Sequence, residues 1–313
     1  MQKYVIYRIN VFCNHIHPAS CQHDMHPLQP TFSKTRIAPT PSGYLHLGNV
    51  LSFSATAALA QRAGAKILLR IDDLDQQRIR TEYVQDIFDT LDFMEIPWHE
   101  GPRNINEYKT QWSQLYRLDS YQQALKRLKL QGNLFACACT RSSRQPCTCS
   151  AKRLFFDDPD CSWKIRTTDD DISMQAYPDE VITTKLPPDV QNFIVRKKDG
   201  LPAYQLASVV DDLLFDIDLV VRGQDLWSST LAQLQLAQKL RVEPFLKTFF
   251  YHHPLLMAHG DQKLSKSAGD TSVKWLREQG KTRADIYSLI AQQFGKNEKV
   301  NTCYELADVL DLW

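Results

Sequence analysis

The sequence lacks any apolar run near 18 residues, although 43% of its 313 residues are hydrophobic. Because a helix needs roughly that length to cross a bilayer, we expect no membrane role. The sequence also lacks an excess of one charge, with 37 basic and 36 acidic residues. Any contact with RNA would therefore depend on local basic patches. Such patches occur at Lys126–Lys129, Arg141–Arg153, Arg196–Lys198 and Lys263–Arg283.

Cysteines are present but unevenly spread, and four of the eight lie between Cys137 and Cys149. We recognise no secretory signal peptide. This distribution favours metal binding in a reducing compartment over a disulfide framework, so we expect a cytoplasmic protein. Cys137 and Cys139 form one close pair and Cys147 and Cys149 another, which is compact enough for a structural tetrahedral Zn²⁺ site. Cys161 is the substitute ligand if one of the four fails.

The chain begins with a stretch, residues 1–33, that follows neither the helical nor the strand period, and we expect it to form a disordered tail. A regular succession of predicted strands and helices starts at Lys34. The pattern predicts a strand over residues 35–39, a helix over 47–63 that Gly64 stops, and a buried strand over 65–71.

The order strand, helix, strand continues with a predicted helix over residues 81–94, which is typical of a doubly wound parallel sheet. Ligands of such a sheet bind at the carboxyl ends of its strands. Residues 108–200 break the rhythm with a long helix over 108–131, the cysteine cluster and a charged strand region.

We interpret residues 108–200 as an inserted, zinc-containing α+β domain. The rhythm then resumes with strands over 203–210, 218–221 and 248–256 and a helix over 226–240. The prediction is an α/β protein with a Rossmann-type catalytic domain split into residues 34–107 and 201–270. Residues 271–313 are expected to form a short helical C-terminal segment.

The segment Ala38–Asn49 joins the first predicted strand to the first helix. A helix N-terminus offers free N–H groups and the positive end of the helix dipole, which suits a phosphate. Glycines let the phosphate approach the backbone, and His46 could donate to a phosphoryl oxygen. Taken alone, such a segment is as often an ordinary turn as a nucleotide site.

A second polar segment, Lys263–Gly269, contains two lysines three residues apart with interleaved hydroxyl groups. This composition suits the β- and γ-phosphates of ATP. A solvated basic loop would explain the segment equally well if it stood alone.

Together, His46–Asn49 and Lys263–Ser267 resemble the HIGH and KMSKS signatures of class I aminoacyl-tRNA synthetases, in the same order. Arg36–Gly43 and Arg70–Asp75 are similar to the RFAPSPTG and RIEDTD segments of the glutamyl group within that class. Ala203–Asp212 and Val221–Gly223 resemble the group's later substrate segments. The resemblance covers about residues 34–290.

Three positions depart from the group's usual pattern. Asn49 replaces the last residue of HIGH. Asp72 stands where the glutamyl group usually has Glu. The related glutaminyl enzymes also have Asp at that position. In the cysteine cluster, Cys147 occupies the place of a Tyr ligand found in the group's shorter members.

The resemblance implies an ATP site, with Mg²⁺, and a neighbouring L-glutamate site. His46, Lys263 and Lys266 would be catalytic through contacts with the phosphates. The residues implied in ATP binding are Pro39, Gly43, His46, Gly48, Asn49, Lys263 and Lys266. Those implied in glutamate binding are Arg36, Ala38, Thr40, Asp72, Tyr204 and Arg222.

Within that glutamate site, Arg36 and Arg222 would hold the γ-carboxylate, and Asp72 and Tyr204 the amino end. Two guanidinium groups pair well with an anion and poorly with a neutral amide, so the site should reject glutamine. A structural salt bridge is the alternative role for either arginine.

The acceptor of the activated glutamate is the remaining question. Full-length members of the group continue into helical anticodon-binding domains, whereas 46 residues follow Ser267 here. In this the chain resembles truncated members that activate glutamate without tRNA and transfer it to queuosine in the tRNA(Asp) anticodon arm. We therefore expect the protein to be a monomer whose RNA partner is the anticodon arm of tRNA(Asp). The alternatives are a minimal glutamyl-tRNA synthetase that charges a 3′ end and a non-catalytic RNA-binding paralogue, which the intact His46, Lys263 and Lys266 disfavour.

Overall fold

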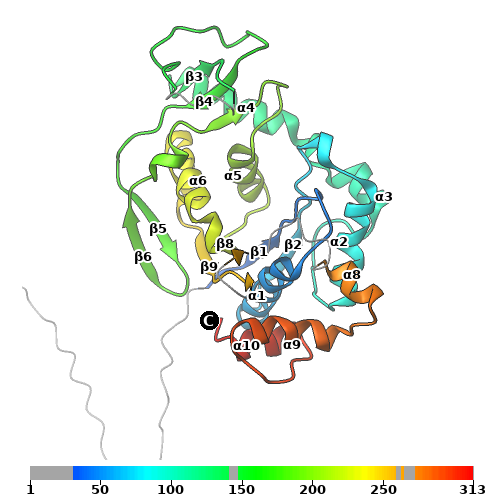
Figure 1. Ribbon diagram of the computed structural model, residues 1–313. Coiled ribbons are helices and arrows are strands. Elements are labelled where there is room, and N and C mark those ends of the chain that lie inside the picture. The colour runs from blue at the N-terminus through cyan, green and yellow to red at the C-terminus, as the bar shows by residue number, and fades with distance from the viewer. Residues whose placement is uncertain (1–30, 141–146, 259–261, 264–271, 313) are drawn as a thin grey trace, which may run out of the picture.

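A six-stranded sheet forms the centre of the computed structural model, which describes residues 31–140, 147–258, 262–263 and 272–312 (Figure 1). The strand order is β2-β1-β8-β9-β5-β6, and all neighbours are parallel except the edge pair β5–β6. The strands are β1 (Lys34–Ile37), β2 (Lys66–Leu69), β5 (Ile172–Ala176), β6 (Glu180–Thr184), β8 (Leu219–Gly223) and β9 (Phe249–His253).

Helices cover both faces of this sheet, so alternate residues of its inner strands are buried in two different cores. In β8, Leu219 and Val221 face the core beneath α1, whereas Val220 faces the core beneath α5 and α6. The longer helices are α1 (Leu47–Ala63), α2 (Thr81–Phe93), α4 (Leu118–Leu130), α5 (Tyr204–Leu214), α6 (Trp227–Leu240) and α9 (Arg283–Gln293). The shorter ones are α3 (Ile105–Glu107), α7 (Glu243–Leu246), α8 (Val273–Glu278) and α10 (Cys303–Val309). In the described parts of the chain, none combines the length and apolar character that spanning a membrane requires.

Helix α1 begins and ends where the sequence predicts. His46 is its N-cap, and the side chain of Asn49 accepts a hydrogen bond from the His46 backbone N–H, which completes a capping box. Gly64 ends the helix in the left-handed conformation, with φ of 63°, which favours glycine. The predicted bounds 47–63 are confirmed.

A second, three-stranded sheet stands apart from the main sheet at the top of Figure 1. It contains β3 (Leu134–Cys137), β4 (Ser162–Ile165) and β7 (Ile194–Arg196), and α4 leads into it. The hairpin β5–β6 also falls within residues 108–200, the range that we predicted to be an insertion. It nevertheless pairs in parallel with β9 and so extends the main sheet.

Two sequence predictions about secondary structure are wrong. Residues 203–210 form the start of helix α5 rather than a strand, because an apolar run of that length fits a buried helix equally well. The helix predicted over 108–131 is interrupted at Ser113, whose backbone is extended and whose hydroxyl donates to Asp73. That hydrogen bond and the one from the Gln114 N–H to Asp73 favour the break over a continuous helix.

Residues 1–30 of the predicted tail lie outside the described residues. Phe32 is buried and packs edge-to-face on Tyr177, with ring centroids 5.9 Å apart. Ser33 donates to the carboxylate of Asp218 from both its backbone N–H and its hydroxyl. The last residues of the predicted tail therefore belong to the folded body.

Candidate active site

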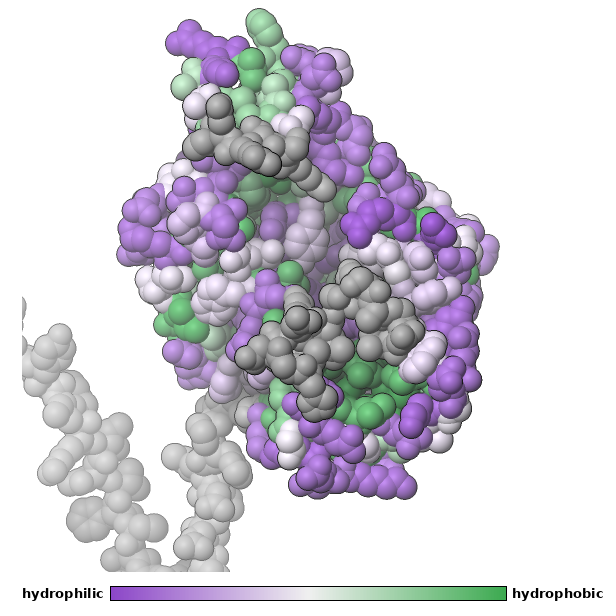
Figure 2. All heavy atoms as spheres, viewed as in Figure 1, coloured by the Kyte–Doolittle hydropathy of each residue, from purple (hydrophilic) through white to green (hydrophobic). Residues whose placement is uncertain are grey.

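A pocket of about 720 Å³ opens where the carboxyl ends of β1, β8 and β9 meet the N-terminus of α1. The face of the molecule shown in Figure 2 is hollowed near its centre and is mainly hydrophilic. Eleven residues predicted from the sequence line the pocket together: Arg36, Ala38, Pro39, Thr40, Gly43, His46, Gly48, Asn49, Asp72, Tyr204 and Arg222.

His46 lies at the start of α1 with a defined ring orientation. Its Nδ1 atom accepts a hydrogen bond of 3.1 Å from the Gly48 backbone N–H. A neutral ring with an accepting Nδ1 carries its proton on Nε2. A Cβ atom at position 48 would lie 3.0 Å from the imidazole, so Gly48 leaves room for it. His46 can therefore donate from Nε2 to an anion near the helix N-terminus.

The structure does not test the positions of the two predicted catalytic lysines. Lys263 belongs to the short strand β11 (Gln262–Lys263), which pairs with β10 (Met257–Ala258). Lys266 lies outside the described residues. The roles of both lysines stay predictions.

Arg222, at the end of β8, is a buried cation whose hydrogen-bond partners are neutral side chains. Its Nη1 donates to the side-chain oxygens of Thr230 at 3.3 Å and Gln233 at 3.1 Å. Nε and Nη2 are buried and have no partner among the described residues. Burial, together with repulsion from Arg36 and Arg70, lowers the pKa of Arg222 to about 10. Two donors of one guanidinium fork thus remain available for an anion.

Arg36, in the neighbouring strand β1, is only partly paired. Its Nη1 donates to the Val221 carbonyl at 3.3 Å, and its Nε lies 3.4 Å from a carboxylate oxygen of Asp212. Asp212 is shared with Arg70, whose Nη1 donates to it at 2.6 Å.

Asp72 and Tyr204 differ in how firmly they are held. The Asp72 carboxylate receives Arg70 Nε at 2.7 Å and Nη2 at 3.1 Å. Burial raises the pKa of Asp72, although Arg70 opposes this effect. Tyr204 begins helix α5 and is 44% exposed, so it can contact a ligand from the solvent side.

Sequence reasoning missed the buried network behind these side chains. Arg70 bridges Asp72 and Asp212, while Asp211 accepts from Arg117, Gln114 and Tyr121 at 2.7–3.1 Å. The sequence did contain a signal for this network. Two adjacent aspartates follow a buried segment twice, once after β2 and once within α5.

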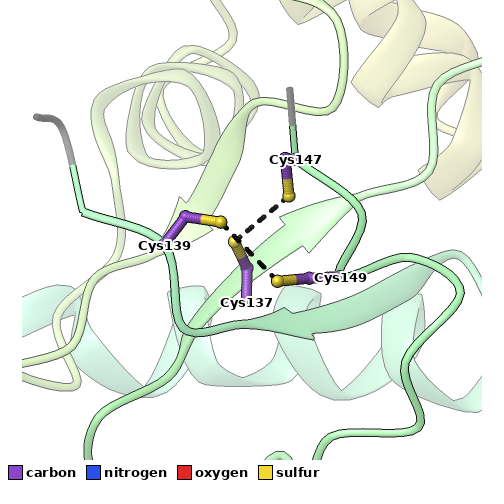
Figure 3. Close-up of side chains that lie close together, drawn as sticks. All are labelled: Cys137, Cys139, Cys147 and Cys149. Atoms are coloured by element: carbon purple, nitrogen blue, oxygen red, sulfur yellow. Dashed lines mark hydrogen bonds between the residues drawn. The ribbon is translucent and has the colours of Figure 1, made fainter. Parts of the chain in front are cut away.

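The cysteine cluster lies apart from the pocket, beside β3. Figure 3 shows the four Sγ atoms turned toward one another. Cys137 and Cys147 are 3.5 Å apart, Cys139 and Cys149 are 3.6 Å apart, and all four sulfurs lie within 4.8 Å of one another. Tetrahedral zinc with Zn–S bonds of about 2.3 Å needs sulfurs roughly 3.8 Å apart, so these residues fit the ion. Cys161 is not part of this group.

Most of the chain is similar to proteins of one family. The family described as tRNA synthetases class I (E and Q), catalytic domain, matches residues 33–145 and 156–311. The glutamate–tRNA ligase 2 of Syntrophus aciditrophicus is 29% identical over 309 residues, which cover 90% of this chain and 62% of that protein. The glutamyl-Q tRNA(Asp) synthetase of Nitratidesulfovibrio vulgaris is 32% identical over 285 residues, which cover 83% of this chain and 86% of that protein.

Solved structures agree on the fold. The glutamate-tRNA synthetase from Elizabethkingia anophelis superposes with a TM-score of 0.66 at 20% identity, over 88% of this chain and 64% of that one. The chain therefore belongs to the class I (E and Q) tRNA synthetase catalytic-domain family, with its Rossmann-like α/β fold. The family predicted from the sequence motifs is confirmed.

Proposed function

We propose that this protein activates L-glutamate with ATP and forms glutamyl-AMP. Arg222 carries this proposal, because an anionic ligand would stabilise a buried guanidinium group with two donors that have no partner among the described residues. It lines the same pocket as the N-terminus of α1, which suits a phosphate. A dicarboxylic amino acid would supply the anion for Arg222, and a nucleoside triphosphate would supply the anion for the N-terminus of α1.

In the proposed reaction, an oxygen of the glutamate α-carboxylate attacks the α-phosphorus of ATP, and the bond from that phosphorus to the bridging oxygen of pyrophosphate breaks. Pyrophosphate is the leaving group, and Mg²⁺, when bound with ATP, would neutralise part of its charge. His46 donates from Nε2 to a phosphoryl oxygen, and Lys263 and Lys266 stabilise the leaving group. Positioning and charge stabilisation suffice, so no residue of the protein acts as a nucleophile.

The γ-carboxylate of glutamate would lie between Arg222 and Arg36. Nε and Nη2 of Arg222 form a fork that matches two carboxylate oxygens. A glutamine side chain offers one oxygen and an NH₂ group, which would leave a buried donor facing another donor. We therefore expect activation to be selective for glutamate over glutamine.

For the acceptor, we propose queuosine in the anticodon of tRNA(Asp). Support comes from the similarity to the glutamyl-Q tRNA(Asp) synthetase of Nitratidesulfovibrio vulgaris. The chain covers 86% of that protein. The competing proposal is charging of a tRNA 3′ end, supported by the similar glutamate–tRNA ligase of Syntrophus aciditrophicus, of which the chain covers 62%.

Two experiments test the function in sequence. Glutamate-dependent pyrophosphate exchange without tRNA tests activation, and the His46→Ala variant should reduce it by about two to four orders of magnitude. Labelled glutamate is then offered to tRNA(Asp) with and without queuosine and to tRNA(Glu), and the label is mapped after nuclease digestion. Label at the queuosine nucleotide supports the main proposal, whereas label at the 3′-terminal adenosine would replace it by a minimal glutamyl-tRNA synthetase.

We also propose that Cys137, Cys139, Cys147 and Cys149 hold one structural zinc ion. Their four Sγ atoms lie within 4.8 Å of one another, and such a compact set of four thiols matches a closed, tetrahedral structural site. Metal analysis should find one zinc per chain, and Cys137→Ser with Cys139→Ser should abolish it. Cys161→Ser is the matched control, and loss of zinc in that variant would contradict the ligand set.

A further inference from the structure

Behind Arg222 lies a group of neutral polar side chains that touches no other part of the pocket. The parallel register of β8 and β9 sets Arg222 beside His252, and both side chains reach α6. Thr230 and Gln233 lie three residues apart on one side of that helix, and both are fully buried. Neither of them lines the pocket, so any effect on a ligand passes through Arg222.

These two residues determine which edge of the Arg222 guanidinium group keeps its donors. An Nη atom of arginine carries two N–H bonds, and Thr230 and Gln233 accept one each from Nη1. Nη1 therefore has no donor left for a ligand. The opposite edge, formed by Nε and Nη2, is the fork that matches a carboxylate. Because both acceptors are uncharged, they orient the group without neutralising its charge.

The Thr230 hydroxyl has three contacts, and one arrangement of hydrogens satisfies them all. Its Oγ1 atom lies 3.2 Å from the Leu226 carbonyl oxygen, 3.3 Å from Nη1 of Arg222 and 2.8 Å from Nε2 of His252. A hydroxyl has one proton and two lone pairs. The proton is donated to Leu226, since a carbonyl only accepts, and the lone pairs accept from Arg222 and from Nε2–H of His252.

His252 is suited to hold this hydroxyl in place. Its ring packs edge-to-face against Trp227, with centroids 5.0 Å apart, and is stacked on Phe250 with centroids 6.4 Å apart. Burial, with repulsion from Arg222 and His253, lowers the pKa of His252 to about 3. The ring is therefore neutral near pH 7 and adds no second positive charge beside Arg222.

We propose that Thr230, oriented by His252, is a positioning residue that presents the Nε–Nη2 edge of Arg222 to the pocket. This inference rests on the proposed function, in which Arg222 binds the γ-carboxylate of glutamate. Without the contact to Thr230, the guanidinium group can turn and offer single donors, which the amide oxygen of glutamine also accepts. The selectivity for glutamate over glutamine should therefore depend on Thr230, although no substrate touches it.

The test measures pyrophosphate exchange with glutamate and with glutamine in the wild type, Thr230→Val and Thr230→Ser. Valine keeps the shape of threonine without its hydroxyl, whereas serine keeps the hydroxyl. We expect Thr230→Val to raise the KM for glutamate about fivefold and to reduce the preference over glutamine by a similar factor, the effect of losing one hydrogen bond. The KM for ATP should not change, and Thr230→Ser should keep most of the preference.

Thr248→Val is the matched control for the loss of a buried hydroxyl. Thr248 is 1% exposed, donates to the Ile217 carbonyl oxygen and does not line the pocket. Its valine variant should keep the KM for glutamate and the preference over glutamine at wild-type values. Reduced preference in this variant as well would mean that Thr230 acts only through general stability.

The role of His252 is tested by His252→Phe, which keeps an aromatic ring beside Trp227 and Phe250 but removes the donor. It should reduce the preference for glutamate less than Thr230→Val does. In the double variant it should add nothing to the effect of Thr230→Val, because it acts through the missing hydroxyl. Additive effects would show that His252 does not act through Thr230.

Unchanged preference in Thr230→Val, or an equal loss in Thr230→Ser, would overturn the assignment. If the wild type shows no exchange with either amino acid, the proposed function fails instead. Nitrogen NMR of the arginine side chains in the ligand-free protein then still tests the positioning, with Arg222→Met to assign the signals. Separate Nη1 and Nη2 signals that merge in Thr230→Val would show that Thr230 restrains Arg222, whereas one averaged signal in the wild type would contradict it.

Discussion

Arg70 and Arg222 are buried to the same extent, each 3% exposed, yet their surroundings are opposite. Arg70 donates to Asp72 and Asp212 and lies 3.8 Å from Asp211. Although burial alone would lower it, these three carboxylates hold the pKa of Arg70 well above its ordinary value. Among the described residues, Arg222 donates only to neutral oxygens, and burial lowers its pKa.

Under the proposed function, the difference separates a cation that stabilises the fold, Arg70, from one that binds a ligand, Arg222. The charge of Arg70 is compensated within the protein, so removing it would strand buried carboxylates. The guanidinium group of Arg222 has no carboxylate within ion-pair distance among the described residues. The free-energy cost of removing its charge from water is therefore not offset by an ion pair within the protein. A buried charge that the fold leaves uncompensated is where an anionic substrate gains the most.

The largest expected effect is on stability. Arg70→Met should lower the free energy of unfolding by about 3–5 kcal/mol, because it leaves Asp72 and Asp212 buried without their cation. Arg222→Met, the matched control, should unfold at the wild-type urea concentration or above it, since it removes an uncompensated charge. Equal destabilisation of both variants in urea titrations would erase the contrast between the two arginines.

The next largest effect is on activation. Arg222→Met should reduce kcat/KM for glutamate in pyrophosphate exchange by about two to three orders of magnitude, because the γ-carboxylate loses a buried charge-assisted fork. The KM for ATP should stay near that of the wild type. Arg222→Lys should recover little, since lysine lacks the planar fork. Near-normal activity with lysine would show that charge alone, without the fork, binds the substrate.

The smallest effect is expected when Arg222 is given a buried carboxylate partner of the kind that Arg70 has. Gln233 accepts from Arg222, and Gln233→Glu would give that cation an internal carboxylate. We expect a protein that resists urea better than the wild type and binds glutamate about tenfold more weakly, because the new carboxylate competes with the substrate. Gln233→Met, which removes the hydrogen bond without adding charge, is the control. Tighter glutamate binding in Gln233→Glu would contradict the argument.

Local chemistry explains which features could be predicted from the sequence. Helix α1 is fixed by its cap residues, and the adjacent carboxyl ends of β1 and β8 bring Arg36 and Arg222 into one pocket, as the parallel-sheet rule requires. Cys147 joins the cysteine group, and Cys161 does not.

Other features depend on tertiary contacts that a sequence does not display. The run before Asp211 is a helix because it packs between α4 and α6, and nothing in its composition excludes a strand. The pairing of β5 with β9 depends on an edge that only the assembled sheet presents.

Strand β1 lies between two partners that a ribosome makes at very different times. β2 pairs Lys34 with Lys66, whereas β8 pairs Thr35 with Leu219. Until the later strand is made, one edge of β1 has unpaired backbone groups, the kind of edge that adds strands from other chains. Contacts so distant in sequence also form slowly, because the entropy of closing the intervening loop opposes them. The strand order that gathers the pocket residues thus leaves β1 with an open edge in the nascent chain until β8 has been made.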